Sequence, residues 1–301
     1  MPRDAESDDH PSLVLRAMRG LSNTARGCAA EMLDAIWPGE CIACQNRIDA
    51  QCAPVVRPGL CAACADLVAP LLASGYCPRC ARTARPESIH ERGCAWCRTE
   101  RVWNIAGIAR LGPYESPLRE LLCDLKFRGS QRAANWISDR LAVELRRQSW
   151  FDRIETLVPV PMHWLRRLQR PCAHARVLAE ALGARLGLPV RSWVWRRRYA
   201  PSQMQIASRH ARMENVADCF GPPLWKLGRI RGRRICIVDN LVVSAATIHE
   251  VSKVLRSLGA AEIYVATACR AVGPAGFQAK PGTAQRVTEL QQGASGAFLD
   301  G

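Results

Sequence analysis

The sequence predicts an α/β protein with a parallel sheet, preceded by a small cysteine-rich module. Three observations indicate this class. Four C-x-x-C pairs lie between positions 41 and 97, strand-like and helix-like segments alternate after position 103, and 301 residues suffice for about two domains. Hydrophobic residues make up 48% of the chain, which is enough for a buried core. No apolar run approaches the roughly 20 residues that a membrane-spanning helix needs.

The first segments of the chain predict a leader and a helix. Residues 1–11 are polar and acidic, unlike the basic start of a signal peptide, so we expect a cytoplasmic protein with reduced thiols. Residues 13–37 have a helical pattern that ends at Trp37-Pro38-Gly39.

The cysteine pairs predict two structural zinc ions. They are Cys41/Cys44, Cys61/Cys64, Cys77/Cys80 and Cys94/Cys97, separated by 16, 12 and 13 residues. Two C-x-x-C turns together supply the four thiolates that structural zinc prefers. Disulfides or redox-active thiols are the alternative, and four pairs at this spacing disfavour it. Pairs taken in sequential order would form two ribbons, and an interleaved order stays open at this point.

Each segment after Trp103 has its own signal. Residues 105–111 alternate like a strand, 131–147 carry apolar residues at helical spacing, and 156–159 form a short apolar strand. Residues 173–186 are a helix closed by Gly187, and 188–195 are expected to be a strand. Residues 234–239 are an apolar run ending in Asp239, 246–258 a helix before Gly259, and 262–268 a last strand. We therefore expect domains at 1–37 (leader and helix), 38–100 (cysteine module), 101–270 (parallel sheet) and 271–301 (flexible tail).

The net charge of +15 is concentrated in one stretch. Between Arg119 and Arg234 there are 24 Lys or Arg and 9 Asp or Glu, and the whole chain has only four lysines. Codon usage that favours arginine explains this composition as well as a phosphate-binding surface does. Charge alone does not distinguish a nucleotide from a nucleic acid.

The turn after Asp239 has the composition of an anion site. Small and hydroxyl residues run from Asn240 to Thr247 into a helix, where backbone N–H groups and the helix dipole favour a negative ligand. A helix N-cap by Ser244 is the alternative interpretation.

Residues 235–247 resemble the phosphoribosyl-pyrophosphate (PRPP) signature of type I phosphoribosyltransferases. Other motifs follow in order: Leu125-Lys126-Phe127, Val158-Pro159-Val160-Pro161, and Arg196-Arg197 with Gln203, Ser208-Arg209, Arg212 and Asn215-Val216. From Cys41 to Arg270 the chain is similar to the ComF/GntX family, in which a double zinc ribbon precedes a phosphoribosyltransferase domain. This resemblance implies a type I phosphoribosyltransferase-like parallel sheet with helices on both faces.

The resemblance also implies a set of site residues. Asp239 and Asn240 would be catalytic, with Mg²⁺ accompanying PRPP. The PRPP-binding residues would be Ser244, Ala245, Ala246, Thr247, Pro161, Arg170, Arg198, Arg209 and Arg212.

Several positions depart from the family pattern. Asn240 replaces a second acid, Val243 a threonine and Ala245 a glycine, and the segment from Arg170 to His174 lacks the usual Asn and Gln. We expect Ala245 to strain a loop that needs positive φ. Transferase activity is therefore expected to be impaired.

Two functions follow from the resemblance. One is PRPP binding with residual or no transfer, in a protein associated with natural competence and DNA uptake. The other is a non-enzymatic zinc-ribbon adaptor that binds single-stranded DNA or a competence helicase. His163 and His174, on either side of the turn after Pro161, could approach a pyrophosphate, although a helix-surface position is commoner. We expect the seven cysteines outside the pairs to be reduced and mostly buried.

Overall fold

The computed structural model describes residues 39–46, 48, 59–91, 93–97, 104–168, 172–199, 209–222 and 230–271. The chain divides into two compact units, residues 1–65 and 66–301, and each is described by itself. The predicted helix at 13–37 and the predicted tail beyond Ala271 lie outside the described residues.

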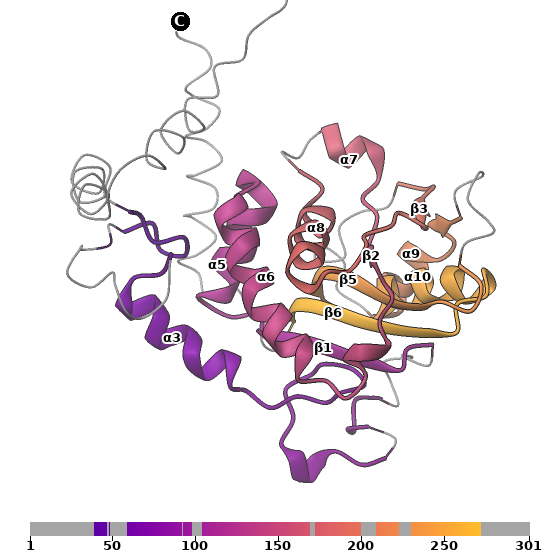
Figure 1. The fold of residues 1–301 in the computed structure, drawn as a ribbon, viewed down its shortest axis with the longest axis horizontal. Coiled ribbons are helices and arrows are strands. Elements are labelled where there is room, and N and C mark those ends of the chain that lie inside the picture. Colours follow the sequence, from indigo (N-terminus) through magenta and orange to yellow (C-terminus); the bar gives the residue numbers. More distant parts are fainter. Residues whose placement is uncertain are drawn as a thin grey trace, which may run out of the picture. The chain divides into compact units, whose positions relative to one another are not determined.

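Helices and strands alternate along the described part of the chain (Figure 1). The helices are α3 (Ala62–Leu72), α5 (Leu118–Cys123), η2 (Asp124–Arg128), α6 (Gln131–Arg146), α7 (Trp164–Leu168), α8 (His174–Leu186), α9 (Arg209–Val216) and α10 (Ala246–Ser257), with short 3-10 turns η1 (Pro86–Ser88) and η3 (Phe151–Arg153). The strands are β1 (Gly107–Pro113), β2 (Thr156–Pro159), β3 (Trp195–Arg196), β4 (Phe220–Gly221), β5 (Arg234–Val242) and β6 (Glu262–Arg270).

Four strands form a parallel sheet in the order β1-β6-β5-β2. The register places one row of apolar residues across the sheet: Ile108, Val265, Ile237 and Val158. All four are buried in one core cluster. Such rows are typical of a parallel sheet that is covered on its faces.

Helices pack on the sheet through apolar residues at helical spacing. In α10, Ile248, Val251 and Leu255 are buried in the same cluster as the row across the sheet. No residue of α6 or α8 belongs to that cluster, and these two helices pack against each other and against other strand residues. Ser130 caps α6 by accepting the N–H of Ala133 at 3.2 Å. Figure 1 shows α6 and α8 side by side.

The predicted parallel α/β class is confirmed, and most predicted segments coincide with observed elements. The strand expected at 188–195 is wrong. Only Val190 bridges to Leu157, flanked by hydrogen bonds at Pro189 and Arg191, and Trp195 belongs to the two-residue β3. Pro189 has no N–H to donate, which limits pairing there.

Candidate functional site

The eight paired cysteines gather into two groups in sequential order. One group is Cys41, Cys44, Cys61 and Cys64, and the other is Cys77, Cys80, Cys94 and Cys97. Within each group the four sulfur atoms lie within 4.8 Å of one another. The first group lies in the 1–65 unit and the second in the 66–301 unit.

Both groups begin with the same backbone turn. The N–H of Gln45 donates to the carbonyl of Cys41, and that of Ala81 donates to the carbonyl of Cys77, each at 2.8 Å. Gln45 and Ala81 follow the second cysteine of their pairs, and both have positive φ, 64° and 59°. The turn therefore presents two sulfurs on one side of the chain at each group, at the cost of a left-handed residue.

The sulfur spacings fit a tetrahedral zinc ion. A Zn–S distance of about 2.3 Å places neighbouring sulfurs roughly 3.8 Å apart. The observed separations are 3.7 Å for Cys44–Cys61, 3.5 Å for Cys77–Cys97 and 3.6 Å for Cys80–Cys94. Both groups can therefore hold zinc.

Glycine makes close packing possible at the second group. Gly93 has φ +92°, and a Cβ there would lie 2.4 Å from Cys97 Sγ. The pKa of Cys77 is lowered to about 4, first because the Cys80 side chain hydrogen-bonds to it and then because backbone N–H groups point at its sulfur. This group is thus arranged to hold at least one thiolate, the form that binds metal.

The second candidate site is the carboxyl end of β5. Asp239 and Asn240 are buried there, and the N–H of Asn240 donates to Asp239 Oδ1 at 2.8 Å. The strand does not end at Asp239 as the sequence pattern suggested, because Leu241 and Val242 still pair with Cys269 and Arg270 of β6. The loop before α10 is therefore only Val243, Ser244 and Ala245.

This short loop contains a buried hydroxyl, that of Ser244, without a hydrogen-bond partner among the described residues. Ser244 is 8% exposed, and its buried Oγ has no hydrogen-bond partner in the described structure. The N-cap of α10 is Ala245, which makes no side-chain cap, so Ser244 does not fill the capping role left open above. The first N–H groups of a helix have no partner within the helix, and an anion can accept from them and from this hydroxyl.

Ala245 is not strained in this structure, and the strain expected for a PRPP-bound loop stays a prediction. Ala245 has φ −68° and ψ 3°, which any L-residue adopts, and its methyl group is buried in the core cluster. The loop geometry present here does not require glycine.

Lys126 is a site residue to which the sequence analysis gave no role. It lies in the π-helix η2, which ends at Gly129 in the left-handed region with φ 69°. Burial raises the pKa of Asp239 to about 6, while the N–H groups of Asn240 and Leu241 and the charge of Lys126 act in the opposite direction. Lys126 is part of the Leu125-Lys126-Phe127 motif, which is the signal that could have identified it.

The other predicted PRPP contacts are only partly described. Pro161 follows β2, whose end is held by the bond from Val160 N–H to Val238 carbonyl at 2.9 Å. The Arg198 guanidinium donates to the carbonyls of Asn215 and Ala217, at 3.3 and 3.0 Å. Ala246 is buried and Thr247 half-buried at the start of α10, and Arg212 lies half-buried in α9. Arg170 lies outside the described residues, and of Arg209 only the helical backbone is described.

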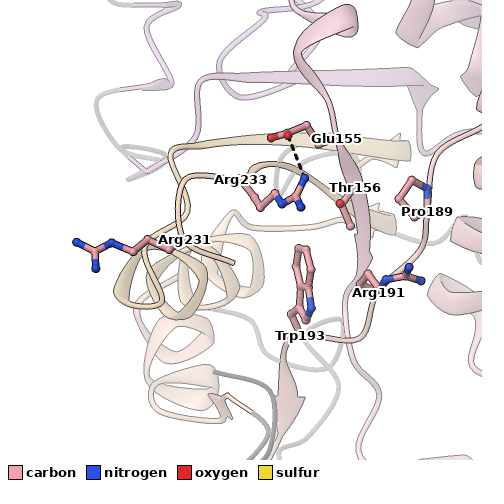
Figure 2. Close-up of a pocket in the computed structure, with 7 residues that line it drawn as sticks. All are labelled: Glu155, Thr156, Pro189, Arg191, Trp193, Arg231 and Arg233. Atoms are coloured by element: carbon pink, nitrogen blue, oxygen red, sulfur yellow. Dashed lines mark hydrogen bonds and ion pairs between the residues drawn. The ribbon is translucent and has the colours of Figure 1, made fainter. Parts of the chain in front are cut away.

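A recess of about 560 Å³ lies near the opposite, amino-terminal ends of β2 and β5 (Figure 2). It is lined by Glu155, Thr156, Pro189, Arg191, Trp193, Arg231 and Arg233. Glu155 accepts from Arg233 at 3.2 Å, the contact drawn in Figure 2. None of the predicted site residues lines this recess.

Within the described part of the chain, no helix has the length and apolarity needed to cross a membrane. Among the cysteines outside the pairs, Cys219, Cys236 and Cys269 are buried, whereas Cys123 and Cys172 are half-buried. His163 is buried rather than on a helix surface, and its Nδ1 accepts the N–H of Leu165 at 3.3 Å.

The fold and these groups define a parallel α/β protein with two four-cysteine groups and a buried polar site at the end of a strand. No family model matches the chain. It is 26% identical over 233 residues to Competence protein F of Haemophilus influenzae, covering 75% of this chain and 94% of that protein. It is also 26% identical over 228 residues to DNA utilization protein YhgH of Escherichia coli K12, covering 71% of this chain and 97% of that protein. These relatives confirm the resemblance to the ComF/GntX family.

Two solved structures match less than half of this chain, at low sequence identity. One is the glutamine PRPP amidotransferase of B. subtilis complexed with ADP and GMP, 21% identical with a TM-score of 0.29, covering 45% of this chain and 26% of that chain. Another is the purine phosphoribosyltransferase of Pyrococcus horikoshii, 17% identical with a TM-score of 0.29, covering 44% and 71%. TM-scores this low carry no argument about the site.

Proposed function

We propose that this chain binds PRPP, or a closely related phosphate ester, at the carboxyl end of β5, with little or no transferase activity, in a cytoplasmic protein that serves DNA uptake. Two zinc ions in the cysteine groups would hold the amino-terminal part of the fold. The names Competence protein F and DNA utilization protein, carried by relatives that align over most of their length, support the link to DNA.

The single observation that supports PRPP binding is the unsatisfied Ser244 hydroxyl. A buried hydroxyl without a partner costs on the order of 1–3 kcal/mol, so a water molecule, an ion or a ligand is expected to satisfy it. It precedes the uncapped start of α10 and follows the buried pair of Asp239 and Asn240. A phosphate at the helix start and a sugar diol at the strand end would satisfy both sets of groups.

The proposed roles follow from these positions. Asp239 and Asn240 would bind the ribose hydroxyls, while Ser244, Thr247 and the first N–H groups of α10 would bind the 5′-phosphate. The negative charge of the pyrophosphate would be neutralised by the four arginines that the family resemblance implies: Arg170, Arg198, Arg209 and Arg212. Stabilisation of this charge matters most as the pyrophosphate leaves. Asp239 would be the carboxylate that holds Mg²⁺, which would supply positive charge to the pyrophosphate, and Asn240 offers no second carboxylate for the metal.

Impairment is expected from lost groups rather than from strain. The hydrogen bond of a charged group is worth roughly 1.5–3 kcal/mol, so Asn240 in place of an acid weakens PRPP about tenfold to a hundredfold. Val243 removes one hydroxyl donor. Because Ala245 has an ordinary φ here, it contributes less than these two.

Calorimetry with PRPP and Mg²⁺ tests the proposal. We expect weak binding by the natural protein and no measurable transfer. The triple variant Asn240→Asp, Val243→Thr, Ala245→Gly should bind at least tenfold tighter, and adding Asp239→Ala should abolish binding. The charge-matched control Asn135→Asp, on the exposed side of α6, should change nothing. Micromolar binding by the natural protein would show that the site is intact, and no gain in the triple variant would show that PRPP binds elsewhere or not at all.

A second candidate function is a non-enzymatic adaptor that binds single-stranded DNA or a competence helicase. The observation that favours it is the excess of 15 positive charges between Arg119 and Arg234, from 24 basic and 9 acidic residues. Binding to nucleic acid through this stretch must weaken steeply as salt rises, because neutralised phosphates release counterions. An affinity that stays flat between low and physiological salt would leave the arginines without a nucleic-acid role.

A further inference from the structure

Exposed apolar side chains are concentrated on two short segments of the larger unit. Among the described residues, nine large hydrophobic side chains are exposed, and five of them lie within 164–168 and 195–199. These five are Trp164, Leu165, Leu168, Trp195 and Tyr199, with exposed fractions from 38% to 77%. Contiguous exposed apolar groups mark binding sites more often than scattered ones do.

Ring contacts join the two segments into one surface. The ring of Tyr199 meets the ring of buried His163 edge-on at 5.5 Å, and the Arg166 guanidinium lies 5.4 Å from the centre of the Tyr199 ring. The pKa of Arg196 is lowered first by burial and then by the nearby positive charges of Arg166 and Arg198. We call residues 164–168 and 195–199 the aromatic–arginine surface.

The surface is held by the fold beneath it. His163 accepts the N–H of Leu165 at the start of α7, and β3 pairs with β4, where Arg196 lies over the Phe220 ring at 5.4 Å. The backbone N–H of Arg197 donates to the Cys219 carbonyl at 2.8 Å. Its exposed rings are therefore presented from a fixed backbone.

The charge of this surface is of one sign. Arginines occupy positions 166, 167, 196, 197 and 198, and no Asp or Glu occurs in 160–170 or in 188–199. The side chains of Arg197 and Arg198 donate to backbone carbonyls, which carry no opposite formal charge. The fitting partner is a polyanion that also offers flat apolar groups.

We propose that the aromatic–arginine surface binds single-stranded nucleic acid, with bases stacked on exposed rings and phosphates on the arginines. This inference rests on the DNA role in the proposed function and gives that role a location. Unpaired bases offer π-faces to Trp and Tyr, whereas a duplex hides them, and stacking of this kind needs no particular sequence. Aromatic residues are only 6% of the chain, and the gathering of three of them here compensates for that scarcity.

Fluorescence anisotropy with a labelled oligothymidine measures the effect. The double variant Trp164→Ala, Tyr199→Ala should lose about tenfold or more in affinity at fixed salt, as expected for lost stacking. Trp96→Ala is the matched control, because Trp96 is equally exposed and also lies under an arginine, Arg82, at 4.7 Å. It should stay within about twofold of the natural protein.

Charge is tested by a second pair of variants. Arg197→Ala should weaken the oligothymidine and reduce the dependence of binding on salt, whereas Arg231→Ala, at the recess of Figure 2, removes the same charge and should do neither. Binding of a duplex of equal length should be indifferent to the loss of Trp164 and Tyr199.

Three outcomes overturn the inference: no binding of oligothymidine, equal losses for Trp96→Ala and the double variant, or a change of oligomeric state in the double variant. The last would make this surface a contact between copies of the chain. PRPP calorimetry on the double variant should match the natural protein. Arg198 belongs to both proposed sites, whereas Trp164 and Tyr199 belong only to this surface. A failed PRPP test with intact oligothymidine binding, or the reverse, therefore distinguishes the two proposals.

Discussion

The two cysteine groups share a spacing and a backbone turn, but they differ in their surroundings. Cys77, Cys80, Cys94 and Cys97 are all buried, in the same core cluster as Ile108 of β1 and Val251 of α10. In the group formed by Cys41, Cys44, Cys61 and Cys64, Cys44 is exposed and Cys61 half-buried. The same metal motif is therefore an integral part of the core in one unit and a local cross-link in the other.

Polar contacts strengthen the integration of the second group. The Tyr76 hydroxyl donates to Glu144 of α6 at 2.6 Å, and the N–H of Ile108 donates to the Pro78 carbonyl at 3.0 Å. The Arg110 guanidinium donates to Thr83 at 2.9 Å. Loss of metal from this group should consequently affect the sheet, whereas loss from the first group should not.

The largest expected effect comes from Cys80→Ser compared with Cys44→Ser. Each should lower the zinc content from two ions to about one, measured by mass spectrometry of the native protein. Structural zinc contributes on the order of 10–16 kcal/mol in small zinc domains, which is comparable with the whole stability of a domain. Cys80→Ser should therefore unfold most of the 66–301 unit, seen as lost helical circular dichroism and lost PRPP binding.

Cys44→Ser should leave the unfolding of the larger unit unchanged within about 0.5 kcal/mol. The control Cys123→Ser, at a half-buried cysteine outside both groups, should keep two zinc ions. Equal destabilisation by the two zinc-ligand variants would break the comparison, and full zinc content in either would show that the ligand set is wrong.

The sequence predicted what depends on spacing and missed what depends on burial. C-x-x-C pairs are local, so the eight metal ligands could be predicted, whereas the division of the four pairs into two groups could not. Period-two and period-3.6 patterns revealed the sheet and most helices. The packing of Cys77 and Cys97 among residues of β1 and α10 depends on contacts far apart in the chain. The same holds for the charge of Lys126 that acts on Asp239, and for the ring contact between His163 and Tyr199, because neither pair is close in sequence.

Burial also predicts a smaller effect at Asp239. Its pKa is raised from 3.8 to about 6, so the folded state resists ionisation there. Below pH 3.8 the carboxyl is protonated in both states and carries no penalty, and stability is lost as pH rises through about 6. A pKa difference of one between the folded and unfolded states corresponds to about 1.4 kcal/mol. The free energy of unfolding is therefore lower by about 3 kcal/mol at pH 8 and by about half that at pH 5.

Asp239→Asn should remove this pH dependence. The measurement is the free energy of unfolding from urea titrations without Mg²⁺ and at constant zinc. The stability gain of the variant over the natural protein should be about 1.5 kcal/mol larger at pH 8 than at pH 5. The same substitution at an exposed carboxylate, Asp152→Asn, should show no such difference. A gain that is equal at both pH values would show that Asp239 is not desolvated, and burial would then be a poor guide to this site.

The smallest expected effect concerns the charge of the buried zinc centre. A zinc ion with four thiolates carries about two negative charges, and burying them is unfavourable without a compensating cation. Arg110 is 1% exposed, and burial lowers its pKa to about 10. Attraction to Cys269 and Tyr76, and to a lesser extent to Cys80 of the zinc group, opposes this lowering. In Arg110→Met, one of the two zinc ions should be lost at about tenfold lower chelator concentration, about 1.4 kcal/mol. Arg140→Met, at an arginine that stacks on Trp136 of α6 at 3.7 Å, should leave both ions at the natural affinity. If both zinc ions of Arg110→Met are lost at the same chelator concentration, or neither is lost earlier than in the natural protein, then the two cysteine groups do not differ in the electrostatic cost of burying their charge.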